Sequence, residues 1–292
     1  MNDIITIIIP TYNRESTLLR SVNSVLNQTY SNIEIIIVDD NSADKTEDII
    51  TNIKDNRVKY VKNNQNRGAC FSRNLGIELS TGKYIAFQDS DDEWNLDKLE
   101  KQLSFMKNNN YDIVSCQMEQ IYDNGKRNIF PNINIKDLNL KDYILWGNVF
   151  STQTILGKKR CFIDEKFDIN MPRFQDWELM IRMSKKYHIG FLNEILVDAY
   201  IQDDSISKNN AKAVKALDII KNKYTYDNKL KSFYFRNMAV YSLYDDKKQA
   251  YKYFNKAYQN DKNNYKNKFN YALIKLNLLN LLKLIYKLKR NI

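Results

Sequence analysis

Short apolar runs rich in β-branched residues alternate with helix-like segments through the first half of this 292-residue chain. The runs are "IITIIIP" at 4–10, "IEIIIVDD" at 33–40, "VKYVKN" at 58–63 and "KYIAFQD" at 83–89. Continuous apolar runs are typical of strands buried on both faces, as in a parallel sheet whose crossovers are helices. Between the first two, "ESTLLRSVNSVLNQ" places apolar residues at helical spacing. The pattern predicts an α/β domain with a mostly parallel mixed sheet flanked by helices.

The pattern continues into the middle of the chain, with one less regular region. Within residues 120–160 we expect a strand or hairpin around Gly125 and a short helix near Leu138 to Leu145. Tyrosine- and lysine-rich helices are expected beyond Asn210. The other expected elements are a helix over 95–109, a strand over 111–118, a helix over 175–187 and two short strands over 188–201.

Charge is divided unevenly along the chain. From residue 212 onward nineteen Lys and Arg residues stand against five Asp and no Glu, so the net charge of +10 comes from this part and the first 211 residues are slightly acidic. We therefore expect two domains, an α/β domain over 1–208 and a basic helical bundle over 209–292. One weak tetratricopeptide-like hairpin in the second does not establish a repeat array. A basic surface favours an anionic partner.

The cysteines and the start of the chain indicate a compartment. Three cysteines, far apart and odd in number, fit neither a disulfide framework nor a CxxC metal site. The start "MNDIITIIIP" lacks the regions of a signal peptide, and no run of eighteen apolar residues occurs. We expect a cytoplasmic protein without a membrane span, with peripheral attachment to the inner face of the cell membrane as a further option.

Polar and acidic stretches follow the expected strands: "PTYNR", "VDDNS", "NQNRGACFSRN" and "QDSDDEW". Each alone has the composition of an ordinary turn, but ligands of open α/β folds bind along this edge of the sheet. Clustered carboxylates repel unless a cation lies between them, and Asp89 and Asp91 suit Mg²⁺ or Mn²⁺ bridged to phosphates. Neither a Rossmann glycine motif nor a P-loop is present, so Arg67 and Arg73 are the candidate phosphate ligands.

Several of these stretches, in order, carry a family resemblance. "IITIIIPTYNRESTLLRSVNSVLNQTYSNIEIIIVDDNSADKTEDII", "NRGACFSRNLGIELSTGKYIAFQDSDDEW" and "QDWELMIRM" resemble the successive signatures of the family-two inverting glycosyltransferases of GT-A fold. The resemblance covers about residues 3–207. It implies a Rossmann-like GT-A catalytic domain over 1–208, followed by a C-terminal α-helical region that lies outside the resemblance.

The resemblance also implies roles for individual residues. Asp176 is the expected catalytic base, and Asp91 is the expected direct ligand of Mn²⁺ or Mg²⁺. With Arg67 added, the expected nucleotide-binding residues are Pro10, Thr11, Tyr12, Glu15, Asp40, Arg67, Arg73 and Asp89. The residues expected near the acceptor or the donor sugar are Asp92, Trp94, Gln175 and Trp177.

Two positions depart from the family pattern. Gln175 precedes Asp176 where the family usually has Glu, which puts acceptor contacts in doubt and leaves the base intact. In "IQDDSIS", Gln202 stands where many relatives have a metal-binding His, so the implied metal shell is weaker unless Gln202 binds through its carbonyl oxygen.

These features predict an inverting, metal-dependent transfer of a sugar from a nucleotide-diphosphate sugar, expected to be a UDP-sugar, to a hydroxyl of a glycan or lipid-linked acceptor in polysaccharide or glycoconjugate synthesis. A single base on the acceptor side implies inversion. One alternative is a sugar-phosphate nucleotidyltransferase, although "PTYNRES" lacks the glycine- and lysine-rich signature usual there. The other is a nucleic-acid-binding protein acting through the basic tail, although no nucleic-acid motif is visible and we expect no such partner.

The last segment, "LIKLNLLNLLKLIYKLKR", is expected to form one terminal helix with a wide apolar face and a narrow polar stripe. Such a helix can form the core strip of a bundle, or it can lie in a membrane interface. We favour bundle packing for most of the tail, with its Lys- and Tyr-rich surface attracting anionic lipid headgroups.

Overall fold

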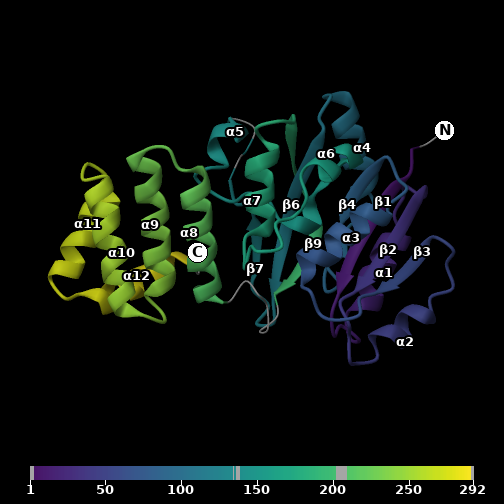
Figure 1. Cartoon of the computed structure of the whole chain (residues 1–292), viewed down its shortest axis with the longest axis horizontal. Helices are drawn as coiled ribbons and strands as arrows, with labels where there is room; N and C mark the ends of the chain where they lie inside the picture. The colour runs from purple at the N-terminus through teal and green to yellow at the C-terminus, as the bar shows by residue number, and fades with distance from the viewer. Residues whose placement is uncertain (1–2, 134, 136–138, 202–208, 291–292) are drawn as a thin grey trace. The chain divides into compact units, whose positions relative to one another are not determined.

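The computed structural model of the chain describes residues 3–133, 135, 139–201 and 209–290 (Figure 1). They form two compact units, which we call unit 1 (1–169 and 175–202) and unit 2 (170–174 and 203–292). The expected domain boundary near residue 208 and the expected metal ligand Gln202 both lie outside the described residues.

Unit 1 is built on a nine-stranded mixed sheet in the order β3-β2-β1-β4-β8-β6-β9-β5, with β7 paired to β6. The first four strands in this order are parallel, and antiparallel pairing begins at β8. The predicted α/β architecture of a mixed sheet flanked by helices is confirmed. The strands are β1 (Ile5–Thr11), β2 (Ile33–Asp39), β3 (Val58–Lys62), β4 (Tyr84–Phe87), β5 (Glu93–Trp94), β6 (Ile113–Tyr122), β7 (Arg127–Phe130), β8 (Leu156–Lys158) and β9 (Ile189–Ile201).

Helices cover the sheet because successive residues of a buried strand face opposite sides. Ile5, Ile7 and Ile9 of β1 share a core cluster with apolar residues of α1 and α4. On the other side, a Cβ atom added to Gly76 of α3 would lie 2.5 Å from Cγ2 of Ile8, so only glycine permits this close approach. The helices of unit 1 are α1 (Leu18–Leu26), α2 (Thr46–Thr51), α3 (Ala69–Leu79), α4 (Lys98–Asn108), α5 (Leu140–Tyr143), α6 (Lys159–Asp164) and α7 (Gln175–Met183), with a 3-10 turn, η2 (Thr152–Thr154).

The structure corrects one predicted element and adds several short ones. The two strands expected over 188–201 are one strand, β9, whose pairing with β6 skips between Leu192 and Ile195. Three further elements, β5, β8 and α6, were not predicted from the sequence, and each has six residues or fewer. The hairpin expected around Gly125 is formed by β6 and β7. Of the helix expected near Leu138 to Leu145, α5 is present, and Leu138 itself lies outside the described residues.

Unit 2 contains five helices within its described residues: α8 (Asn210–Tyr224), α9 (Asn228–Ser242), α10 (Lys247–Asn260), α11 (Tyr265–Lys275) and α12 (Leu279–Arg290). The amino ends of α8, α9, α10 and α11 are each capped by an Asn or Asp side chain that accepts a backbone N–H. The single terminal helix that we expected is divided, because α11 ends at Lys275 and Asn277 has a φ of 57°. No helix in the part of the chain that the structure describes has the length and apolarity needed to cross a membrane.

Candidate active site

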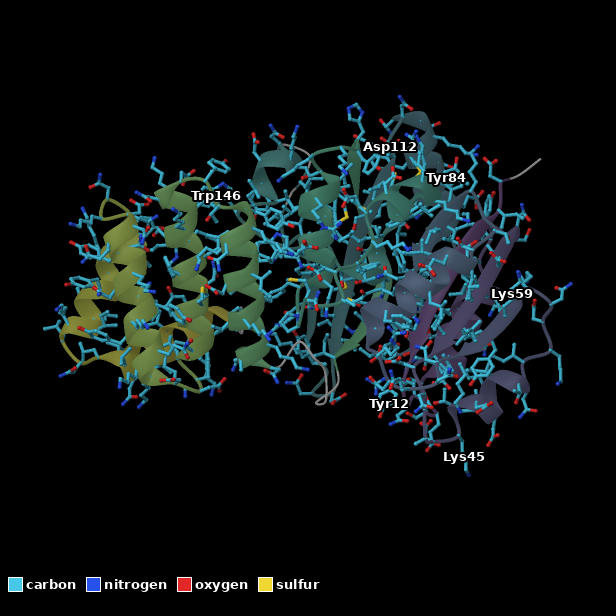
Figure 2. All side chains as sticks on the ribbon, viewed as in Figure 1. Tyr12, Lys45, Lys59, Tyr84, Asp112 and Trp146 are labelled. Atoms are coloured by element: carbon cyan, nitrogen blue, oxygen red, sulfur yellow. The ribbon has the colours of Figure 1, made fainter. Side chains whose placement is uncertain are left out.

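The carboxyl ends of three parallel strands meet at one edge of the sheet of unit 1. Because β1 pairs in parallel with both β2 and β4, the residues that follow these strands reach the same edge. Figure 2 shows Tyr12, which follows β1, at the opposite end of unit 1 from Tyr84, the first residue of β4. The stretches singled out in the sequence therefore lie together.

Asp40 organises the loop that leads into α3. Its Oδ1 accepts hydrogen bonds from Asn63 Nδ2 at 2.8 Å and from the backbone N–H of Arg67 at 2.9 Å, and its Oδ2 accepts the N–H of Gly68 at 2.6 Å. Gly68 has a φ of 85°, which favours glycine. The carboxylate can accept about four hydrogen bonds, so roughly one position is left for a ligand.

The loop after β1 is tied to the loop after β2. The backbone N–H of Asn13 donates to Ser42 Oγ at 2.9 Å, and Glu15 accepts the N–H of Lys45 at 2.9 Å. Pro10 and Thr11 belong to β1 and are buried, whereas Tyr12 is exposed. The Oγ1 atom of Thr11 is buried and has no hydrogen-bond partner among the described residues. An unpaired buried hydroxyl at a strand end is a position where a bound ligand can supply the partner.

Arg73 and Asp89 form a partly buried ion pair at the same edge. Arg73 Nη2 lies 2.8 Å from Asp89 Oδ1, and only 7% of the arginine is exposed. Its guanidinium carbon lies 5.5 Å from the ring centre of Phe167, and its Nε has no hydrogen-bond partner among the described residues. Arg73 thus brings positive charge and an unused N–H donor to the acidic strand ends.

Two arginines that we did not single out hold the loop that carries Asp91. Arg20 Nη2 donates to the backbone carbonyl of Asp91 at 2.6 Å and pairs through Nε with Glu93 at 2.9 Å. Arg14 Nε lies 3.6 Å from Asp91 Oδ2. Arg14 belongs to "PTYNR", so its position in a loop after a strand could have identified it as a candidate site residue. Arg20 lies inside α1, and nothing in the sequence distinguishes it from a surface arginine.

Asp92 and Trp94, which we expected near the sugar, lie in the interior. Asp92 is 4% exposed; its Oδ1 accepts the N–H of Tyr200 at 3.0 Å and its Oδ2 accepts Gln153 Nε2 at 2.8 Å. Burial, together with the charges of Asp89 and Asp91, raises the pKa of Asp92. Trp94 is also 4% exposed and donates from Nε1 to the carbonyl of Gln153. Both residues therefore support the loop from inside the protein.

Asp176, the second residue of α7, is partly buried. Its Oδ1 accepts the N–H of Trp177 at 2.7 Å and lies 3.4 Å from Asn148 Nδ2. Burial raises its pKa to about 6; the positive charge of Arg73 lowers this pKa and the negative charge of Asp89 raises it. Asp176 therefore shares its electrostatic surroundings with the Arg73–Asp89 pair. Both of these hydrogen bonds from described residues reach Oδ1, and neither reaches Oδ2.

The remaining predicted residues differ in exposure. Trp177 is 4% exposed and donates from Nε1 to the carbonyl of Ile144 at 2.6 Å, so it anchors α7. Gln175, the first residue of α7, is half-buried. Arg67 is exposed, with its guanidinium carbon 3.5 Å from the ring centre of Phe71, and both line a pocket of about 380 Å³.

Comparison with known proteins gives the family. Residues 6–165 match the family model described as glycosyl transferase family 2. The chain belongs to glycosyl transferase family 2. Over 207 aligned residues it is also 34% identical to an uncharacterized glycosyltransferase of Rickettsia bellii, covering 70% of this chain and 30% of that protein. The chain spans about a third of the length of the Rickettsia relatives that it matches.

Other relatives of this family-2 chain have comparable lengths. The Escherichia coli protein named UDP-Glc:alpha-D-GlcNAc-diphosphoundecaprenol beta-1,3-glucosyltransferase WfgD is 30% identical over 257 residues, covering 86% of this chain and 97% of that protein. Staphylococcus aureus TarS 1–349, solved with UDP-GlcNAc, has a TM-score of 0.68 at 16% identity, covering 88% of this chain and 81% of that one. These similarities confirm the predicted GT-A fold. The family match supports neither the nucleotidyltransferase nor the nucleic-acid-binding alternative.

The residues present fit a cation that is shared with a substrate. Asp91 is partly exposed, Asp89 keeps Oδ2 outside its pair with Arg73, and no group of three His, Cys, Asp or Glu residues poised to hold a metal occurs among the described residues. Mg²⁺ and Mn²⁺ are commonly bound by one or two carboxylates and completed by substrate phosphates and water. This donor set suits that arrangement and does not suit a caged structural ion.

Proposed function

We propose that this family-2 chain is an inverting glycosyltransferase that transfers a sugar from a nucleotide-diphosphate sugar to a hydroxyl group of an acceptor. The observation that carries the proposal is Asp176: a carboxylate with a pKa raised to about 6, in the same electrostatic surroundings as the Arg73–Asp89 pair at the strand ends. A general base works best when its pKa is close to the working pH.

In the proposed reaction, the acceptor oxygen forms a bond to the anomeric carbon while the bond from that carbon to the diphosphate oxygen breaks. The acceptor proton passes to Asp176 Oδ2, and the electron pair of the broken bond leaves with the nucleoside diphosphate. Attack from the side of Asp176, opposite the leaving group, inverts the anomeric configuration. Positioned proton transfer of this kind contributes ~10²–10⁴-fold in rate.

In this proposal, residues at the strand ends bind the nucleotide-diphosphate sugar. Thr11 Oγ1 and the free capacity of Asp40 would take the nucleoside, and Arg73 Nε would donate to the diphosphate. Asp91, with Asp89, would hold Mn²⁺ or Mg²⁺. When bound, the cation would neutralise charge on the leaving diphosphate. Tyr12, Glu15 and Arg67 lie in the loops at this edge and Pro10 lies near the end of β1; these four residues would complete the nucleotide-binding wall.

The named relatives suggest the substrates. WfgD is named for transfer from UDP-Glc to a GlcNAc linked to diphosphoundecaprenol, and TarS was solved with UDP-GlcNAc. A mannosyltransferase from Pyrobaculum calidifontis, similar in fold, was solved with GDP-Man and Mn²⁺. We therefore propose a UDP-sugar donor, a lipid-linked or glycan acceptor in polysaccharide synthesis, and work at the cytoplasmic face of the membrane as a peripheral protein. Gln175, which precedes Asp176 in α7, would contact that acceptor.

A transfer assay tests the proposal. The chain is incubated with UDP-glucose or UDP-N-acetylglucosamine, Mn²⁺ and a GlcNAc-diphospholipid, and the products are identified by mass spectrometry. We expect an acceptor one sugar heavier, a β-linkage by NMR from the α-configured donor, and loss of transfer in EDTA. An α-linked product would exclude inversion. Release of pyrophosphate from a nucleoside triphosphate and a sugar phosphate, without transfer, would identify a nucleotidyltransferase instead.

A further inference from the structure

The last helix of unit 2, α12, has apolar residues on two of its faces. Leu282 is fully buried in the core of the helical unit. Leu281, Leu284 and Leu288 are instead exposed, with 44%, 53% and 56% of their surface accessible. These three positions follow the i, i+3, i+7 spacing of one helix face and form a continuous leucine stripe. The core does not need the leucine stripe, because α12 already buries its other apolar face.

The surroundings of the leucine stripe are basic. Lys283 and Lys287 lie one turn apart on α12; Lys287 is exposed, and Lys283 lies 5.1 Å from the ring centre of Tyr244. No Asp or Glu follows Asp261 in the sequence, and the chain from residue 212 onward has an excess of fourteen positive charges. An apolar stripe bordered by lysines combines the two properties by which a helix binds a charged lipid surface.

We propose that the leucine stripe docks on an anionic lipid surface, with its three side chains in the interfacial region and the neighbouring lysines at the headgroups. Charge decides between the possible occupants. A second copy of this chain would bring two strongly basic surfaces together and repel. An anionic lipid surface has the complementary charge and accepts leucine side chains. The inference deepens the peripheral membrane attachment included in the proposed function by assigning it to the leucine stripe. It can be tested separately from the transfer reaction, because binding to vesicles needs neither donor nor acceptor.

Vesicle flotation with the full chain tests the inference. We expect binding to vesicles of phosphatidylcholine mixed with phosphatidylglycerol, weak binding to phosphatidylcholine alone, and a loss of binding in high salt. Replacing Leu281, Leu284 and Leu288 together by Ser should weaken binding by about tenfold or more, since the buried leucine surface supplies much of the affinity. Leu79→Ser is the matched control, because Leu79 is a 44% exposed leucine on α3 of unit 1, and it should bind as the wild type does.

A second measurement keeps the test independent of the folding of the triple variant. The three native cysteines are buried free thiols, so a cysteine introduced as Leu284→Cys can be labelled selectively with an environment-sensitive dye. We expect a blue shift of its emission on anionic vesicles, and no shift for Leu79→Cys. Equal shifts at both positions, or wild-type protein that stays unbound, would overturn the inference. A wild-type dimer in light scattering that the triple substitution dissociates would also overturn it, by showing that a second copy covers the stripe.

Discussion

Three carboxylates of the site differ in how the fold surrounds them. Asp92 is buried and accepts hydrogen bonds at both carboxylate oxygens, and Asp89 is paired with Arg73. Asp176 is partly buried and accepts hydrogen bonds from described residues at Oδ1 only. Environment alone can give chemically identical side chains separate roles. In our proposal Asp92 positions the loop, Asp89 faces the donor together with the neighbouring Asp91, and Asp176 accepts the proton.

Removing the base is the sharpest single-residue test. Asp176→Asn should lower kcat by ~10²–10⁴-fold, because the amide cannot accept the proton of the acceptor hydroxyl. Its melting temperature at pH 7 should equal or exceed that of the wild type, because burial makes the ionised Asp176 unfavourable. Initial rates and circular dichroism melts measure both. Asp48→Asn, at an exposed aspartate of α2, is the control, and full activity in Asp176→Asn would contradict the assignment.

The pH dependence of the rate follows from the same side chain. Burial raises the pKa of Asp176 to about 6, so below that pH the residue is protonated and cannot act as a base. We expect kcat/KM to rise with pH through about 6 and to level off above it, whereas residual activity of Asp176→Asn should lack this step. A wild-type profile that stays flat between pH 5 and 8 would refute a titrating Asp176.

For single residues, the sequence predicted which side chains lie at the strand ends, but it did not predict which of them are buried. The acidic residues at strand ends were visible from their place after apolar runs, and the structure brings Asp40, Asp89 and Asp91 to one edge of the sheet. That Asp92 is buried was not visible, because its partners Gln153 and Tyr200 are 61 and 108 residues away. Long-range partners decide whether a carboxylate faces a ligand or supports a loop.

At the scale of elements, one buried polar network joins the acidic loop to η2, α4 and β9. Gln153 of η2 donates to Asp92 and accepts the indole N–H of Trp94 through its carbonyl. Lys98 of α4 lies with Nζ 3.8 Å from the ring centre of Trp94 and donates to Gln102 at 2.8 Å. The backbone N–H of Tyr200 in β9 also donates to Asp92, so three elements are linked behind the loop that carries Asp91.

Gln153→Ala should loosen this network. It leaves Asp92 Oδ2 buried without its donor, which costs about 1–3 kcal/mol in the free energy of unfolding. We also expect a lower kcat, because the loop that carries Asp91 loses a support. Urea unfolding and initial rates measure the two effects. Gln120→Ala, at a half-buried glutamine of β6, is the comparison, and equal stability of both variants would argue against the network.

Because Lys98 belongs to this network, the stability of the protein should depend on pH in a characteristic way. Lys98 is fully buried, and burial lowers its pKa to about 8. In the unfolded chain a lysine has a pKa of about 10.4, so between these values the unfolded state holds a proton that the folded state has lost, and stability rises with pH. Relative to Lys98→Met, the wild type should gain on the order of 3 kcal/mol across this window. Parallel stability curves from urea unfolding at pH 7, 8, 9 and 10 would contradict the buried charge.

Elements with regular periodicity were predictable, and short or irregular ones were not. The strands β1, β2 and β4 were visible as short, mostly apolar runs, which are typical of buried strands, and β3 was visible from the alternating apolar residues of "VKYVK". The two residues of β5 and the three of β8 are too few to show a period. Asn193 and Glu194 interrupt the apolar pattern of β9, so one irregular strand was taken for two. The break at Asn277 lacks the Gly or Pro that usually announces a helix end.

At the scale of the whole molecule, a donor that binds only the folded protein should raise its melting temperature. A nucleoside diphosphate at a hundred times its Kd stabilises by about 2.7 kcal/mol. We expect UDP with Mn²⁺ to raise the melting temperature of the wild type and to raise that of Arg73→Met less, since Arg73 supplies the charge at the diphosphate. A thermal-shift series over UDP, GDP and ADP measures this. Equal shifts in both proteins would remove Arg73 from the donor site.

The way Asp40 holds the loop before α3 has a consequence for how such a protein can diversify. Two of its three hydrogen bonds are to the backbone N–H groups of Arg67 and Gly68, and backbone groups are present whatever the side chains are. Residues 64–67 can therefore be exchanged while the path of the loop is kept. Libraries randomised at these four positions should yield mostly folded proteins, which makes this loop a suitable starting point for engineering new donor preferences.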